Sequence, residues 1–245
     1  MWFALAGSLC AQPVVSAKAG LISYARGRVY LNDRPLQVSA ARFTEVKQNA
    51  VVRTGQGRAE VLLGPCAAVR IGEESSFRML DTRLTAPQVQ LLSGSAVVDI
   101  ANLAKGVAIT LRLDPAAVAM ARPGTYRFDF SPARLKVFDG RTAVERPAGR
   151  IEVGAGRMLT WDAAAPEKFE PRNGDALDLW SRRRNLVLAR SQRARPPMPP
   201  SIAPNVSDAS RSRPGVRGMA GSAPMGRPGA PSTPPTWRES GCKAR

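Results

Sequence analysis

The stretch VVRTGQGRAEVLLGPCAAVRIGEESSFRM, from Val51 to Met79, decides the fold expected of this chain. Apolar and polar residues alternate through it, which is the pattern of half-buried β-strands with a period of two residues. The inward-facing set that this alternation predicts is Ala59, Val61, Leu63, Val69, Ile71, Phe77 and Met79. Glycines interrupt the pattern, so we expect two pairs of strands joined by glycine-containing turns.

One sequence motif from this stretch recurs. It consists of an apolar residue, four intervening residues, a glycine, usually an arginine, and then a strand. Its copies are ISYARGRVYL, VRTGQGRAEV, VQLLSGSAVV, LKVFDGRTAV and IEVGAGRMLT, with glycines Gly27, Gly57, Gly94, Gly140 and Gly156. Arginine follows four of these glycines, as Arg28, Arg58, Arg141 and Arg157. We expect the glycines to take positive-φ turn positions. Because their spacing is irregular, the repeats predict an all-β domain that is either an irregular β-solenoid or a twisted β-sandwich.

A single helix is expected after the β domain, over residues 173–190. Asn173 or Asp175 can cap it, acidic residues come early and arginines late, as the helix dipole favours. The side chains expected to pack on the sheet are Leu177, Trp180 and Val187. The run of three arginines from Arg182 to Arg184 is expected to form a solvated face.

The two ends of the chain differ in composition from the middle, which gives a β domain over residues 20–172. Residues 1–19 include an apolar stretch of signal-peptide length but no positively charged start, so we expect a truncated secretory signal. Residues 191–245 are rich in proline, glycine and serine and predict a disordered tail. No apolar stretch reaches the length of about 18 residues that a membrane span needs. The expected location is therefore periplasmic or secreted.

The net charge and the residue types present limit the classes of function expected of this chain. The net charge of +17 indicates either an anion-binding protein or an arginine-rich coding bias. Nucleic acid is a disfavoured partner, because no aromatic residues alternate with a basic face. The chain has no histidine, which removes the usual general base and metal ligands, so we expect no enzyme, no cofactor and no metal site.

The three cysteines are Cys10, Cys66 and Cys242. If a signal segment is removed, Cys66 and Cys242 remain, and in an oxidising compartment they are able either to pair or to stay apart.

The run from Gly20 to about Arg190 resembles the FecR domain, the extracytoplasmic domain of iron-dicitrate sensors, and especially its stand-alone form behind a signal peptide. The resemblance rests on TGQGRAEVLLGPCAAVRIGEESSFRM, TRLTAPQVQLLSGSAVVDI, PGTYRFDF, LKVFDGRTAV and the Asp178–Ser181 helix segment with its arginines. Cys66 departs from the family, which usually has glycine there. The resemblance implies a non-enzymatic β domain that binds another envelope component. Sigma-factor control and a TonB-dependent receptor are implied by the resemblance only.

Two hypotheses of different classes follow. The first is a protein-binding module that docks an envelope protein by strand addition or along a β face. The second is a cationic structural protein of the envelope that holds anionic polysaccharide or lipid headgroups. A single exposed ladder formed by Arg28, Arg58, Arg141 and Arg157 favours the second hypothesis, and scattered arginines favour ordinary surface charge.

Overall fold

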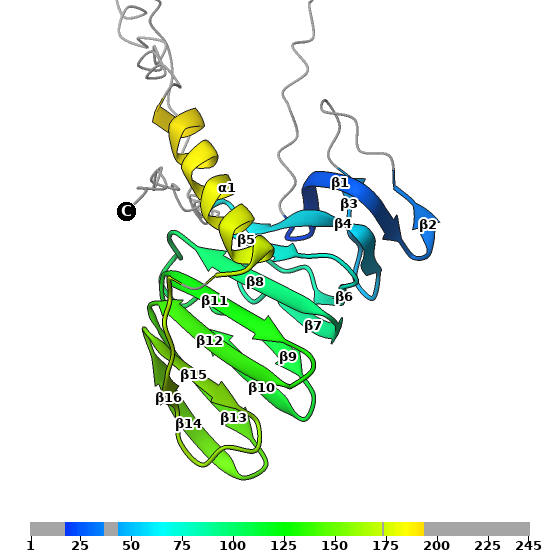
Figure 1. Cartoon of the computed structure of the whole chain (residues 1–245). Coiled ribbons are helices and arrows are strands. Elements are labelled where there is room, and N and C mark those ends of the chain that lie inside the picture. The colour runs from blue at the N-terminus through cyan, green and yellow to red at the C-terminus, as the bar shows by residue number, and fades with distance from the viewer. Residues whose placement is uncertain (1–17, 37–43, 173, 194–245) are drawn as a thin grey trace, which may run out of the picture.

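The computed structural model describes residues 18–36, 44–172 and 174–193, which form a large sheet and one helix (Figure 1). Almost all of the expected signal segment and tail lies outside these residues. The elements are β1 (Leu21–Leu31), β2 (Arg34–Pro35), β3 (Thr44–Glu45), β4 (Val51–Gly64), β5 (Ala67–Ile71), β6 (Ser76–Asp81), β7 (Gln88–Ser93), β8 (Ser95–Ile100), β9 (Ile109–Leu113), β10 (Ala116–Met120), β11 (Gly124–Asp129), β12 (Arg134–Asp139), β13 (Arg141–Arg146), β14 (Gly149–Gly154), β15 (Arg157–Thr160), β16 (Glu167–Lys168) and α1 (Ala176–Arg193). The expectation of an all-β fold with one C-terminal helix is confirmed.

Strand β4 joins two halves of the sheet, which we call its arms. Its first residues, 51–53, pair with β6, whereas residues 59–64 pair with β5. The sheet therefore continues in two directions from β4, through β5, β8, β11, β12, β15 and β16 on one side and through β6, β7, β9, β10, β13 and β14 on the other. The two arms lie one behind the other in Figure 1, with β14 and β16 at opposite ends of the pairing path. The result is a twisted, open β-sandwich.

The hydrophobic core fills the space between the two arms. The residues that the alternation in Val51–Met79 placed inward are all buried in this single cluster, which confirms that prediction. In β8 the same alternation sends Ala96, Val98 and Ile100 into the core, whereas Val97 packs with the helix on the opposite face. Period-2 patterning therefore defines both an inner and an outer face of the sheet.

The expected turn at Gly57 is wrong, because β4 runs through this glycine as one strand of 14 residues. Gly57 lies directly opposite Gly27 of β1, and a Cβ at Gly57 would lie 2.6 Å from the Arg26 carbonyl oxygen and 2.8 Å from the Arg28 nitrogen. The glycine is needed because the two strands approach closely there. Positive φ holds for the other four repeat glycines, Gly27, Gly94, Gly140 and Gly156. The expected turn is nevertheless wrong for Gly27 also, because this glycine lies inside strand β1.

Helix α1 begins at Ala176 and crosses the outer face of the β5–β8–β11 layer (Figure 1). Asp175 caps it, since its Oδ1 accepts hydrogen bonds from the Leu177 and Asp178 nitrogens at 3.0 and 3.1 Å. The helix continues to Arg193 and so is shifted toward the C-terminus relative to the expected 173–190. Among the described elements, no helix has the length and apolar character needed to cross a membrane.

Replacing Gly57 by alanine tests the close approach of β1 and β4. The added methyl group meets backbone atoms of β1 that have no freedom to move aside, so we expect Gly57→Ala to lower the free energy of unfolding by about 1–3 kcal/mol. The matched control is Gly154→Ala in strand β14, where an added Cβ meets no atom within 4 Å. Urea denaturation compares the two variants, and equal stability would contradict the close approach.

Candidate functional site

A row of residues crosses the outer face of the sheet beneath α1. Tyr24 of β1, Glu60 of β4, Arg70 of β5, Val97 of β8 and Arg127 of β11 lie directly opposite one another on successive strands. Directly opposed residues share one face of a sheet, so these side chains all point toward the helix. The row alternates acidic, basic and apolar groups, and α1 docks on it through two clusters of ion pairs.

The Glu60 cluster consists of Glu60, Arg70, Arg184, Ser23 and Ser181. Glu60 is fully buried, and its carboxylate accepts hydrogen bonds from Arg70 Nε at 2.7 Å, Arg184 Nη2 at 2.6 Å and Ser23 Oγ at 2.7 Å. Arg70 also donates from Nη1 to Ser181 Oγ of the helix at 2.7 Å. One buried carboxylate thus joins β1, β4, β5 and α1.

The surroundings of Glu60 keep it ionised. Burial acts most strongly and raises the pKa of this carboxyl, but the hydrogen bond from Arg184 and the charge and hydrogen bond of Arg70 together outweigh it. The pKa of Glu60 therefore lies below its ordinary value. Asp99, which lies 3.7 Å from Arg70, differs in direction, because burial dominates and raises its pKa.

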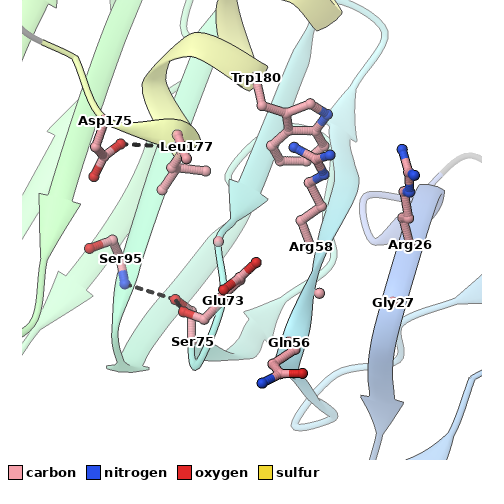
Figure 2. Close-up of a pocket in the computed structure, with 13 residues that line it drawn as sticks. Arg26, Gly27, Gln56, Arg58, Glu73, Ser75, Ser95, Asp175, Leu177 and Trp180 are labelled. Atoms are coloured by element: carbon pink, nitrogen blue, oxygen red, sulfur yellow. Dashed lines mark hydrogen bonds between the residues drawn. The ribbon is translucent and has the colours of Figure 1, made fainter.

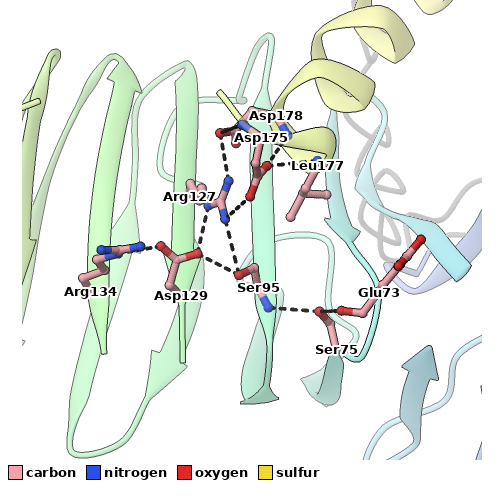
Figure 3. A network of polar contacts seen from close by, with 9 residues as sticks. All are labelled: Glu73, Ser75, Ser95, Arg127, Asp129, Arg134, Asp175, Leu177 and Asp178. Carbon is pink, nitrogen blue, oxygen red and sulfur yellow. Dashed lines mark hydrogen bonds and ion pairs between the residues drawn. The ribbon is translucent and has the colours of Figure 1, made fainter. Parts of the chain in front are cut away.

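The Arg127 cluster, shown in Figure 3, consists of Arg127, Asp129, Arg134, Asp175 and Asp178. The Arg127 guanidinium is buried and contacts Asp129 at 2.9 Å, Asp175 at 2.7 Å and Asp178 at 2.8 Å. Arg134 adds a second contact to Asp129 at 2.7 Å. Because Asp175 caps α1 and Asp178 lies in its first turn, one arginine of β11 fixes the start of the helix to the sheet.

Two carboxyls of the Arg127 cluster have lowered pKa values. For Asp129, burial raises the pKa, but the charge of Arg127 and the hydrogen bond from Arg134 outweigh it. For Asp175, burial likewise raises the pKa and the hydrogen bond from Arg127 outweighs it. Burial lowers the pKa of Arg127, but the hydrogen bond that Arg127 donates to Asp175 and the charges of Asp129 and Asp178 outweigh it, so this pKa is raised. Arg127, Asp129 and Asp175 are therefore ionised at neutral pH.

Apolar contacts between helix and sheet are few. Leu177 and Trp180 are buried against Val97 and Tyr24, with the Tyr24 and Trp180 ring centroids 5.6 Å apart. The expected packing of Val187 is wrong, because this side chain is 49% exposed. Figure 1 shows the reason, since the C-terminal half of α1 extends past the edge of the sheet.

The expectation of a solvated face from Arg182 to Arg184 is also wrong in part. Arg184 is 18% exposed, binds Glu60, and lies over the Tyr24 ring at 4.8 Å from its centroid. Arg182 lies over the Phe138 ring at 5.5 Å and donates to the Pro171 carbonyl oxygen. Arg183 is exposed as expected.

A groove of about 530 Å³ opens beside the first turn of α1 (Figure 2). Its walls come from β1, β4, the loop between β5 and β6, and the helix. The lining residues are Arg26, Gly27, Gln56, Gly57, Arg58, Gly72, Glu73, Ser75, Ser95, Asp175, Ala176, Leu177 and Trp180. Arg58 reaches toward Trp180, with its guanidinium 5.3 Å from the ring centroid. The helix wall of this groove is held by both ionic clusters.

The structure does not bring together the four arginines of the repeated sequence motif. Arg58 lines the groove, and Arg28 is exposed on the neighbouring strand β1. Arg141 lies at the start of β13, in the arm that contains β6, and Arg157 lies at the start of β15, in the arm that contains β5. Several strands separate these last two from β4 in the pairing order, so no single ladder forms.

Sequence reasoning missed Arg26, Glu60 and Arg70 as site residues. Arg26 precedes the glycine of its copy of the motif, and the other copies have unrelated residues at this position. Glu60 and Arg70 fall on the outward face of the alternation, where a period of two predicts solvent exposure. Only their placement beneath the separate helix α1 buries them.

Cys66 lies in the turn between β4 and β5 and does not take a positive φ, so this turn does not require the glycine usual in FecR domains. Cys66 is disulfide-bonded. Cys10 and Cys242, the second of which the sequence leaves open as a partner for Cys66, lie outside the described residues. The described part of the chain holds no group of three or more histidine, cysteine, aspartate or glutamate side chains placed to bind a metal ion.

Comparisons with known proteins give a distant structural likeness. No protein-family model matches the chain, and no curated protein matches it. Two crystal structures of a candidate anti-sigma factor from Parabacteroides distasonis ATCC 8503 are similar, each with 12% identity and a TM-score of 0.40. The match covers 49% of this chain and 59% of the other, which is less than two thirds of its length. The resemblance to FecR domains stays a prediction.

Neutralising Glu60 tests the Glu60 cluster. Glu60→Gln removes the carboxylate 2.7 Å from the buried guanidinium of Arg70 and leaves only the more distant Asp99, at 3.7 Å, so we expect the free energy of unfolding to fall by about 3–5 kcal/mol. The matched control is Glu145→Gln, whose ion pair with Arg150 is solvent-exposed, with both side chains more than half exposed. This control is expected to change stability by less than about 1 kcal/mol. Similar losses in the two variants by urea denaturation would contradict a buried cluster.

The stability of the fold is expected to decline in acid. Glu60, Asp129 and Asp175 have lowered folded pKa values, so their contribution is complete above the unfolded values of about 4 and is lost as pH falls through the folded ones. Asp99 acts in the opposite direction, because its raised pKa favours the folded state in acid. Because three carboxyls destabilise the fold in acid and one stabilises it, we expect the free energy of unfolding to fall below about pH 4.

Thermal unfolding followed by circular dichroism measures this acid dependence. Glu60→Gln removes one of the three carboxyls, so its melting temperature should fall less steeply with pH than that of the original chain. A melting temperature that is constant from neutral pH down to about pH 3 would show that the carboxyls are not ion-paired.

Proposed function

We propose that this chain is a non-enzymatic, extracytoplasmic binding module of the FecR type, and that it docks a protein partner in the groove beside α1. The observation that carries the proposal is the groove itself, which two buried ionic clusters hold open at the junction of helix and sheet. A site whose walls are fixed before binding loses little conformational freedom when a partner enters. The apolar segment within residues 1–19 supports the location.

The carboxylates near the groove support binding over catalysis. Glu60 and Asp129 are held ionised by arginines, so neither has a proton to donate near neutral pH. Glu60 binds Arg184 of the helix, and Asp129 binds Arg127, which in turn binds Asp178 of the helix. The chain contains no histidine to serve as a general base. These groups position the helix wall of the groove, and we assign them no chemical step.

The arrangement of arginines favours a protein partner over a cationic scaffold for envelope polymers. A polymer-holding surface needs a continuous run of cations. Arg58 lies in the groove, whereas Arg141 and Arg157 lie in different arms of the sheet. We therefore do not carry the structural-protein hypothesis further.

Site-specific photo-crosslinking tests the groove as the docking site. A photoreactive phenylalanine replaces Gln56, an exposed groove residue, in the host that naturally makes the chain. The matched control places it at Gln48, an exposed residue of the turn before β4 and outside the groove. We expect a discrete protein adduct from position 56 and none from position 48, because only the first probe lies in the groove.

Fractionation of the same cells tests the location. The adduct is expected in the periplasmic or secreted fraction. Identical adducts from both positions, no adduct from position 56, or an adduct confined to the cytoplasm would contradict the proposal.

A further inference from the structure

We infer that the groove receives an acidic segment of the partner protein, with a carboxylate held between Arg26 and Arg58. This inference rests on the proposed function and names the chemistry of the groove's occupant. Arg26 of β1 and Arg58 of β4 are directly opposed in the strand register and both line the groove. Like charges at directly opposed positions repel, because their Cβ atoms are only about 5 Å apart.

This repulsion is not relieved by the rest of the described structure. Neither Arg26 nor Arg58 forms an ion pair with a carboxylate of the described residues. The next arginine along β4 differs, since Arg53 pairs with Asp33 at 3.3 Å and lies over the opposed Tyr30 ring at 4.2 Å. Arg26 and Arg58 therefore place two positive charges without a carboxylate partner among the described residues on the wall of the groove.

The geometry around the arginine pair prepares it for an anion. Arg58 lies over the ring of Trp180, which is 7% exposed and fixed by helix docking, so its guanidinium has a defined position. Gly27 and Gly57, the adjacent opposed pair, carry no side chains and leave the groove floor bare. A carboxylate between two guanidinium groups forms charge-assisted hydrogen bonds, which are roughly twice as strong as neutral ones.

The rest of the lining selects a peptide over an anionic polysaccharide. Leu177 and Trp180 supply an apolar wall that suits the side chain of a neighbouring residue. Glu73 lies across the groove from the arginine pair in Figure 2, so one end is positive and the other is negative. A polymer with a carboxylate on every unit would place negative charge against Glu73. A protein segment with one acidic residue beside apolar or polar residues matches both ends.

A peptide titration of the full chain tests the inference. The probe is an acetylated and amidated peptide with one central glutamate flanked by leucine and serine residues, and its twin has glutamine in place of that glutamate. Binding is followed by the NMR signals of the Trp180 indole and the Arg58 guanidinium. We expect the glutamate peptide to bind and the glutamine peptide to bind at least about tenfold more weakly.

Matched double variants assign the effect to the arginine pair. Arg26→Gln with Arg58→Gln should weaken the glutamate peptide by at least about tenfold. The control, Arg78→Gln with Arg122→Gln, removes the same charge from exposed residues outside the groove and should bind like the original chain. Since Arg58 also packs on Trp180, Arg26→Gln alone serves as a second variant and should weaken binding without disturbing the helix.

Equal binding of the two peptides, or unchanged binding by the arginine variants, would overturn the inference. So would saturation of the groove signals by polygalacturonate when the glutamate peptide has no effect. The photo-crosslink from position 56 distinguishes a failure of this inference from a failure of the proposed function. If it persists in the double variant, the groove still binds a protein and only the acidic specificity is wrong; if the original chain gives no adduct, the proposed function itself fails.

Discussion

The arrangement of helix and sheet depends on one buried carboxylate. Glu60 is fully buried, and its oxygens accept hydrogen bonds from Ser23 of β1, Arg70 of β5 and Arg184 of α1. An ionised group removed from water costs several kcal/mol unless hydrogen bonds and opposite charge compensate it. The compensation here exists only when strand and helix meet in this register, so the ion pair selects one docked position for a helix with few apolar contacts.

The second cluster extends this constraint to the start of the helix. Arg127 binds Asp175 and Asp178, so the first turn of α1 is fixed at a point distant from Glu60 along the row. Two anchors on one helix determine both its position and its direction across the sheet. Trp180 lies between them and presents its ring to Arg58, which turns a structural contact into a wall of the groove. The docking interactions and the candidate site are therefore physically inseparable.

The sequence predicts well which side chains face the core. It predicts poorly which side chains attach the helix to the sheet. Alternation from Ala59 to Met79 identifies the core-facing residues, because local periodicity reports the two faces of a strand. Asp175 is recognisable as a cap for the same local reason. Glu60 and Arg70 look like ordinary solvent-facing residues, since nothing near them in sequence reveals that a helix more than 100 residues later covers them. The sequence wrongly predicts a turn at Gly57, because the need for glycine there depends on the separate strand β1.

The most direct test of this account is a double-mutant cycle between Glu60 and Arg184. Unfolding free energies of the original chain, Glu60→Gln, Arg184→Gln and the double variant give the coupling energy of the pair. If the buried carboxylate docks the helix, the coupling should be about 1–3 kcal/mol, because each single variant leaves a partner unpaired. A coupling energy near zero would mean that α1 is positioned by other contacts, and the groove would lose the constraint that holds its helix wall.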